Sequence, residues 1–204
     1  MCMRVVAEGY CCKTVHVGEE TQPQYLYRFR MPGLTVDTVP LGRTTEGEVC
    51  VLLVQRGMRT EPVEFRGRWA FAGGFLNYGQ ENDVQAAGRE CYEETGAALD
   101  EKQHAYLIRL TVASDAARDP RGHMVSSVFL RVLGAPVVKS DVLHTADAEE
   151  IAGSQWWPLQ DALRMPLAFD HSALLQRAVD VYTYLESLTS DVREGVLKFA
   201  QMQM

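Results

Sequence analysis

One stretch of the sequence, residues 69–97, constrains the fold more than any other, because a glycine pair there leads into a segment rich in glutamate. The pair, Gly73 and Gly74, follows the strand-like apolar run of residues 69–72. Two glycines in a row permit a tight turn and let a ligand come close to the backbone. We therefore expect a strand followed by a turn that a ligand can approach.

The segment after the turn has the signals of a helix with defined ends. After a loop over residues 75–81, Asn82 is a good N-cap, and Gln85 can complete a capping box with it. Gly96 stands where helices commonly end in a glycine. The sequence therefore predicts a helix at about residues 82–95.

The predicted helix carries three carboxylates on one patch. At about 100° per residue, Glu90, Glu93 and Glu94 share an arc beside an apolar stripe. Like charges this close repel each other, so a helix with a purely structural role would gain nothing from them. Hard divalent cations with oxygen ligands would neutralise the patch, and Mg²⁺ bound to phosphates fits best.

This pattern resembles the signature motif of the Nudix hydrolase superfamily: a glycine, a glutamate, then Arg-Glu, two residues, Glu-Glu, one residue and a glycine. The matching residues are Gly74, Glu81, Arg89, Glu90, Glu93, Glu94 and Gly96. The half from Arg89 to Gly96 has the usual spacing. Between Gly74 and Glu81 stand six residues where the family normally has five, so either Glu81 or Gln80 takes the glutamate position.

The resemblance implies an α/β fold, namely an α/β/α sandwich with a mixed β-sheet, and a metal-dependent hydrolase. It also implies a site for Mg²⁺ (or Mn²⁺), in which the helix carboxylates are both metal ligands and catalytic groups. The expected metal ligands are Glu90, Glu93, Glu94 and the backbone carbonyl of Gly73. Arg89 would pair with a glutamate of the motif and fix its rotamer. The expected supporting positions are Gly74, Glu81, Arg89 and Gly96.

A second motif, Arg-Asp-Pro-Arg-Gly at residues 118–122, stands between two strand-like runs. This arrangement resembles Nudix domains associated with ADP-ribose and NAD metabolism, and the likeness covers roughly residues 27–180. In a substrate-binding role, Arg118 and Arg121 would fork onto phosphate oxygens or ribose hydroxyls, with Asp119 between them. Alternatively, Asp119 caps the turn and both arginines are solvated.

Two further regions are candidates for the site. Arg56 closes the strand-like run 48–57, and the resemblance suggests a phosphate or ribose contact, with a solvated strand end as the alternative. Residues 139–155 form an acidic segment that we expect to be a loop. Nudix enzymes often draw a general base or a further metal ligand from such a loop, so Glu149 and Glu150 are candidates. Alternatively, the acidic loop is simply solvated.

Patterns elsewhere complete the expected fold. The expected strands, rich in β-branched residues, are residues 34–41, 48–57, 104–114 and 123–133, the first two joined as a hairpin. A long helix begins near residue 169, with Asp170 available as its N-cap, and we expect the neighbouring His171 to be structural.

Length and composition limit the class of protein. The 204 residues suffice for one core, which we expect over residues 34–188, with an N-terminal arm or edge strand at 1–33 and a short helical tail at 189–204. The five cysteines show no zinc-type pairing with histidines, and the net charge of −7 argues against general binding to nucleic acids. No apolar run is long enough to span a bilayer. We therefore expect a cytoplasmic protein with reduced thiols and no nucleic-acid or membrane partner, with homodimerisation left open.

The predicted function is metal-dependent hydrolysis of a nucleoside diphosphate linked to another moiety, with ADP-ribose cleaved to AMP and ribose 5-phosphate as the leading reaction. One alternative is a non-catalytic ADP-ribose or nucleotide sensor, suggested by the extra residue before Glu81 and by a resemblance to NAD-related regulators. Another is a hydrolase of NADH, sugar nucleotides or diadenosine polyphosphates. Residues 189–204 are too few for a winged-helix DNA-binding domain, which favours the hydrolase.

Overall fold

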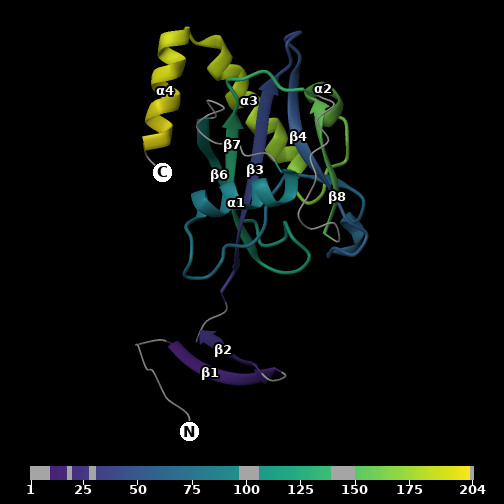
Figure 1. Ribbon diagram of the computed structural model, residues 1–204, viewed down its shortest axis with the longest axis vertical. Helices are drawn as coiled ribbons and strands as arrows, with labels where there is room; N and C mark the ends of the chain where they lie inside the picture. Colours follow the sequence, from purple (N-terminus) through teal and green to yellow (C-terminus); the bar gives the residue numbers. More distant parts are fainter. Residues whose placement is uncertain (1–9, 18–19, 28–30, 97–105, 139–149, 203–204) are drawn as a thin grey trace. The chain divides into compact units, whose positions relative to one another are not determined.

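The computed structural model describes residues 10–17, 20–27, 31–96, 106–138 and 150–202. The chain divides into two compact units, Met1–Pro32 and Gly33–Met204 (Figure 1). In the first unit, β1 (Tyr10–Val17) and β2 (Glu20–Tyr27) pair antiparallel and form a two-stranded sheet of their own. The second unit holds all the other described elements.

The second unit is built on a mixed six-stranded sheet. The hydrogen-bonded order is β5-β4-β3-β7-β6, and β8 pairs with β4. Only β3 and β7 run parallel, and the other pairs are antiparallel. The strands are β3 (Gly33–Arg43), β4 (Val49–Arg56), β5 (Trp69–Ala70), β6 (Tyr106–Ala113), β7 (Met124–Val132) and β8 (Ile151–Pro158).

Helices cover both faces of this sheet (Figure 1). They are α1 (Asp83–Thr95), α2 (Leu159–Ala162), α3 (His171–Ser187) and α4 (Ser190–Met202), with a 3₁₀ turn at Val63–Phe65. α1 lies on one face and α3 on the other, while α4 packs against β6. The predicted α/β/α sandwich with a mixed sheet is therefore confirmed.

Alternation along the strands explains why both faces are covered. In β4, Val51 and Leu53 join the core cluster of α3, whereas Val54 joins the cluster that contains Cys91 of α1. Successive side chains of a strand point to opposite faces, so a strand that is apolar at every position needs a partner on each side. The almost unbroken apolar run of β4 is of this kind.

The glycine turn lies where β3 and β4 diverge. The two strands pair only near their connection, from Leu41↔Val51 to Arg43↔Val49. Further along, β5 pairs with β4, and the carbonyls of Ala72 and Gly74 accept hydrogen bonds from backbone N–H groups of β3. Residues 69–74 therefore run between the two diverging strands and close the gap with backbone hydrogen bonds.

Local signals placed α1 correctly, and two other expectations were wrong. Asn82 and Gln85 form the predicted capping box, and Gly96 ends the helix at φ 66°. The segment 139–155 is not all loop, because its last five residues belong to β8, whose pairing with β4 depends on a distant strand. Asp170 occupies the N-cap position of α3, but its side chain makes no capping bond because it pairs with Arg118.

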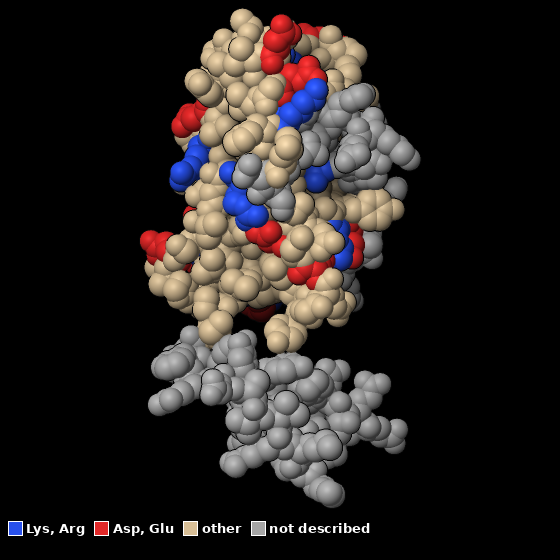
Figure 2. Space-filling model, turned by 90° about the vertical axis from the view of Figure 1, so that its left-hand side faces the viewer, with Lys and Arg blue, Asp and Glu red and all other residues tan. Residues whose placement is uncertain are grey.

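Acidic and basic side chains are mixed on the face of the molecule shown in Figure 2, where Lys and Arg lie beside Asp and Glu. No helix in the described part of the chain has both the length and the apolar character needed to cross a membrane.

Candidate active site

A cavity of about 540 Å³ lies beside the glycine turn. Its lining comes from β3, the end of β4, residues 59–61, the turn, α1, residues 118–121 and the segment that leads into α3. This size lies within the range of small-molecule sites. The cavity thus lies where the sheet, α1 and three loops meet.

The two glycines of the turn are required by close packing. A β-carbon on Gly73 would lie 2.1 Å from the carbonyl oxygen of Val36, and one on Gly74 would lie 2.6 Å from the carboxylate of Glu90. The backbone N–H of Gly73 donates to Oε2 of Glu94 at 2.8 Å. The glycines therefore bring the backbone directly against the carboxylates of α1.

Two of the three predicted metal-binding glutamates line this cavity. Burial raises the pKa of Glu94 well above its ordinary value; the N–H of Gly73 lowers it, and the carboxylates of Glu90 and Asp37 raise it further. Burial also raises the pKa of Glu90, against the effect of Arg89. Buried carboxylates that repel one another are stabilised by a cation.

Arg89 connects the remaining carboxylates of the motif. Its Nε and Nη2 donate to the two carboxylate oxygens of Glu81 at 3.0 and 2.6 Å. Its Nη1 donates to Glu90 at 2.8 Å and to Glu93 at 2.9 Å, and its Nη2 also reaches the carbonyl of Phe75 at 3.0 Å. Glu93 is half-exposed and does not line the cavity. Arg89 therefore orients carboxylates of the motif without lining the cavity itself.

Glu81, rather than Gln80, is the residue that contacts Arg89. In the loop before it, Gly79 adopts a left-handed conformation at φ 70°. The backbone N–H of Asn77 also donates to Glu81 at 2.8 Å. The irregular half of the motif is thus tied to its regular half through the ion pair of Glu81 with Arg89.

The donor set at the turn fits a hard divalent cation. Glu90 and Glu94 offer carboxylate oxygens inside the cavity, and the adjacent Gly73 offers a backbone carbonyl. Among the described residues, no three His, Cys, Asp or Glu side chains form a ready cluster for a metal ion. Glu93, the third predicted ligand, accepts a hydrogen bond from Arg89 and does not line the cavity. The remaining ligands of such a cation would be water and substrate phosphate.

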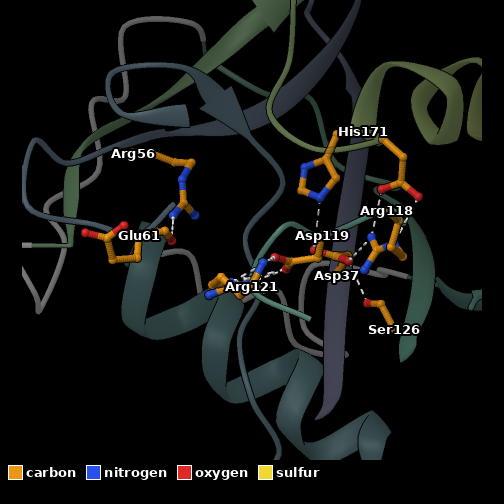
Figure 3. Close-up of polar contacts among 9 residues, drawn as sticks. Asp37, Arg56, Glu61, Arg118, Asp119, Arg121, Ser126 and His171 are labelled. Carbon is orange, nitrogen blue, oxygen red and sulfur yellow. Dashed lines mark hydrogen bonds and ion pairs between the residues drawn. The ribbon is translucent and has the colours of Figure 1, made fainter. Parts of the chain in front are cut away.

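A buried carboxylate, Asp37 of β3, forms the floor of the cavity (Figure 3). Ser126 donates to its Oδ2 at 2.6 Å, and Nε2 of His171 lies 3.4 Å from its Oδ1. Nδ1 of His171 accepts the N–H of Phe71 at 3.0 Å, so the ring proton resides on Nε2. Burial tends to raise the pKa of Asp37, but His171, Ser126 and Arg118 together lower it.

Arg118 is held by carboxylates and is not solvated. Its side chain is 5% exposed, and its Nε and Nη2 donate to Asp170 at 3.0 and 2.8 Å. It also lies 3.5 Å from Asp37. The alternative of a solvated arginine is therefore wrong for Arg118, which ties the cavity floor to the start of α3.

Asp119 and Arg121 form a tight unit. Asp119 is buried, accepts the backbone N–H of Arg121 at 2.9 Å, and pairs with its guanidinium at 2.7 Å. The Arg121 guanidinium lies over the rings of Phe75 and Phe169, with its Cζ 5.7 and 5.5 Å from their centroids. Asp119 thus both caps the turn and orients an arginine along the cavity wall.

Arg56, at the end of β4, lines the cavity. Its Nη2 donates to the carbonyl of Glu61 at 2.5 Å (Figure 3), and no described carboxylate lies within ion-pairing distance. Its buried Nε has no hydrogen-bond partner in the described part of the chain. Burial and the nearby Arg121 both lower its pKa. A bound anion would relieve both effects.

Of the two candidates in the acidic segment, Glu150 is exposed and lines the cavity, and its carbonyl accepts the N–H of Gly57 at 2.6 Å. Glu149 lies outside the described residues.

Several cavity residues were not identified as site residues from the sequence, among them Asp37, Phe75 and Phe169. Asp37 offered one signal, since it is the only charged residue in the run from Leu34 to Leu41. Its partners stand 81 to 134 positions away, so only the fold reveals what it does. Phe75 gave no signal that separated it from core residues, and Phe169 lies in a segment, residues 167–171, whose only signal was its resemblance to Nudix domains.

Comparison with known proteins agrees with this geometry. A family model described as NUDIX domain matches residues 31–178. The chain belongs to the NUDIX domain family. The predicted Nudix resemblance is thereby confirmed.

Two relatives of this NUDIX domain protein indicate which ligands related proteins use. It is 34% identical over 146 residues to an ADP-ribose pyrophosphatase of Methanocaldococcus jannaschii, covering 71% of this chain and 72% of the relative. It is 30% identical over 148 residues to the ADPR responsive transcriptional repressor NtrR of Acinetobacter baylyi, covering 72% of this chain and 53% of the relative. The chain thus spans about half the length of that repressor.

A solved structure is similar as well. The NUDIX domain of Shewanella oneidensis NrtR, crystallised with ADP ribose, superposes with a TM-score of 0.63 at 30% identity. The match covers 76% of this chain and 90% of that domain. This structure agrees with the fold derived above.

Proposed function

We propose that the protein is a metal-dependent hydrolase that cleaves the diphosphate linkage of a nucleoside diphosphate joined to another moiety. ADP-ribose, converted to AMP and ribose 5-phosphate, is the substrate we favour. The observation that carries the proposal is a single cavity lined both by the carboxylates of Glu90 and Glu94 and by the guanidinium groups of Arg56 and Arg121.

The reaction adds one water to the diphosphate: a new P–O bond forms, the bridging P–O bond breaks, and two phosphate monoesters leave. A divalent cation held by Glu90, Glu94 and the Gly73 carbonyl would neutralise charge on the phosphate oxygens. Arg56 and Arg121 bind the diphosphate, and Arg89 keeps Glu90 in place.

Glu150 is our candidate for the group that takes the proton from the attacking water, because it is exposed and lines the cavity. Asp37 suits this role less well, since its lowered pKa makes it a weak base and its oxygens already face Ser126 and His171. Replacing Glu150 by Gln should therefore lower kcat without weakening ADP-ribose binding. Equal kcat for the variant and the wild type would remove Glu150 from the mechanism.

Two relatives support ADP-ribose as the substrate. One is named an ADP-ribose pyrophosphatase, and the other was crystallised with ADP ribose. The test is to incubate the purified protein and Mg²⁺ with ADP-ribose, NADH, sugar nucleotides and diadenosine polyphosphates in parallel, and to identify the products. Release of AMP and ribose 5-phosphate supports the proposal, whereas faster cleavage of another dinucleotide transfers it to that substrate.

A second candidate function is a sensor that binds ADP-ribose without cleaving it. The observation that favours it is the similarity to a repressor that responds to ADPR. Binding of ADP-ribose in EDTA, together with no product in Mg²⁺ or Mn²⁺, would support the sensor. Steady release of AMP, lost in the Glu94→Gln variant, would eliminate it.

A further inference from the structure

Phe169 has an unusual backbone conformation. Among the described residues it is the one non-glycine residue with positive φ, at 52°. The left-handed region is unfavourable for residues with a β-carbon, and a bulky residue there is an outlier. Such strain persists where the surroundings over-determine it, and it gathers at functional sites.

The neighbours of Phe169 hold this conformation in place. The N–H of Ala168 donates to the carbonyl of Trp69 at 2.9 Å, and the N–H of His171 donates to the carbonyl of Ala168 at 3.1 Å. Asp170, between them, is anchored by its ion pair across the cavity floor. With both flanks fixed, Phe169 keeps its ring in the cavity wall.

The ring of Phe169 meets two cations. The guanidinium carbon of Arg56 lies 5.0 Å from its centroid, and that of Arg121 lies 5.5 Å from it. The charge of Arg121 lowers the pKa of Arg56, so the two cations repel, and the negative face of an aromatic ring offsets part of that cost. The other side-chain contacts of the two arginines are the Glu61 carbonyl, the Asp119 carboxylate and the Phe75 ring.

We propose that Phe169 is a positioning residue that holds Arg56 and Arg121 at the spacing needed to bind one phosphate group of the substrate. A guanidinium packed on an aromatic ring keeps N–H donors at its edge, and these match phosphate oxygens. The inference rests on the proposed function for the identity of the substrate, but the arginine pair itself takes any diphosphate anion that fits the cavity.

Three replacements separate the ring from the backbone strain. Phe169→Leu keeps apolar volume and removes the aromatic face, Phe169→Trp keeps an aromatic face, and Phe169→Gly removes both the ring and the strain. Phe199→Leu, on the exposed face of α4, is the matched control. Binding of inorganic pyrophosphate and of ADP-ribose to the full chain is measured by calorimetry in EDTA, and thermal unfolding reports folding.

We expect Phe169→Leu and Phe169→Gly to weaken binding of both ligands about tenfold, or about 1.4 kcal/mol. Phe169→Trp and Phe199→Leu should stay within about threefold of the wild type on the same scale. In a protein that already carries Arg121→Ala, adding Phe169→Leu should weaken ligand binding little further, because the ring acts through the pair of Arg56 and Arg121. A purely structural role predicts additive losses instead, and additive losses would overturn the inference.

The remaining outcomes separate this inference from the proposed function. Wild-type affinity in Phe169→Leu, or no binding of pyrophosphate and ADP-ribose by the wild type, would overturn the role of Phe169. Binding of both ligands that depends on Phe169, without AMP release in Mg²⁺, would overturn the hydrolase and leave the role of Phe169 standing.

Discussion

At the scale of single residues, the geometry of Arg89 matters more than its charge. One guanidinium reaches both oxygens of Glu81 and also Glu90 and Glu93, which a lysine ammonium cannot do from one position. The pairs are partly exposed, so their contribution to stability is small. Their value lies in fixing the direction of the Glu90 carboxylate.

Arg89→Lys should therefore weaken metal binding while the fold is kept. Loss of a group that orients a metal ligand typically costs about 10- to 100-fold in affinity or activity. The measurement is the Mg²⁺ dependence of hydrolysis, with circular dichroism to check folding. Arg164→Lys, an exposed arginine near α2, is the control and should behave as the wild type. An unchanged Mg²⁺ dependence in Arg89→Lys would contradict the assigned role.

Glu94 should show a conflict between stability and function. Burial raises its pKa, so its ionised form destabilises the folded state once the pH rises above the ordinary carboxyl range. In EDTA at pH 8, Glu94→Gln should raise Tm by a few degrees, since about 1 kcal/mol corresponds to about 2–4 °C at this size. Near pH 4 the two proteins should unfold together.

The same Glu94→Gln variant should be inactive and should gain no thermal stability from Mg²⁺. Glu194→Gln, on exposed α4, should change neither property. A lower Tm than the wild type at pH 8 in EDTA would show that the Glu94 carboxylate is not destabilised by burial.

At the scale of elements, two glycines within residues 69–97 have opposite requirements. Gly73 leaves no room for a β-carbon, because Val36 O would lie 2.1 Å away. Gly88, in the interior of α1, would place a β-carbon in open space. The strand gap thus demands a glycine at Gly73, whereas α1 merely tolerates one at Gly88.

Alanine at the two positions should therefore have effects of opposite sign. Gly88→Ala should stabilise α1 by roughly 0.8–1.0 kcal/mol and leave activity unchanged. Gly73→Ala should push the turn away from β3, lower Tm, and reduce activity through the lost N–H contact with Glu94. Urea unfolding and initial rates of the two variants, measured side by side, test this. Equal stability of the two would contradict the packing of the turn.

Elements set by local signals were predictable, and those set by distant partners were not. The ends of α1 are set by residues in or next to the helix, namely Asn82, Gln85 and Gly96, so the sequence alone predicted its position. β8 is defined by its pairing with β4, about a hundred positions earlier. The acidic residues before it have the pattern of a loop, so its first residue could not be predicted. Asp170 was predicted to cap α3, but its carboxylate accepts hydrogen bonds from the buried guanidinium of Arg118 instead.

At the scale of the whole molecule, Asp37 links parts of the chain that are far apart in sequence. It connects β3 to β7 through Ser126, to the 118–121 loop through Arg118, and to α3 through His171. The carboxylate patch of α1 could be predicted from the spacing of its glutamates, whereas this floor could not, because none of its contacts is local. A network of contacts between distant positions is therefore harder to predict from the sequence than a pattern within one helix.

The same network should make the acid stability of the fold depend on Asp37. Its pKa is lower in the folded state than its ordinary value of about 3.9, so its contribution is complete above that value and is lost as the pH falls through the folded pKa. Asp37→Asn should therefore lower Tm at pH 7, and the difference from the wild type should shrink below about pH 4. Scanning calorimetry of both proteins from neutral to acidic pH measures this, with Asp180→Asn on α3 as a surface control. The same comparison is made in the Glu94→Gln background, because the Asp37 charge raises the pKa of Glu94 in the wild type. A difference that stays constant across the acid range would mean that Asp37 contributes through packing and not through its charge.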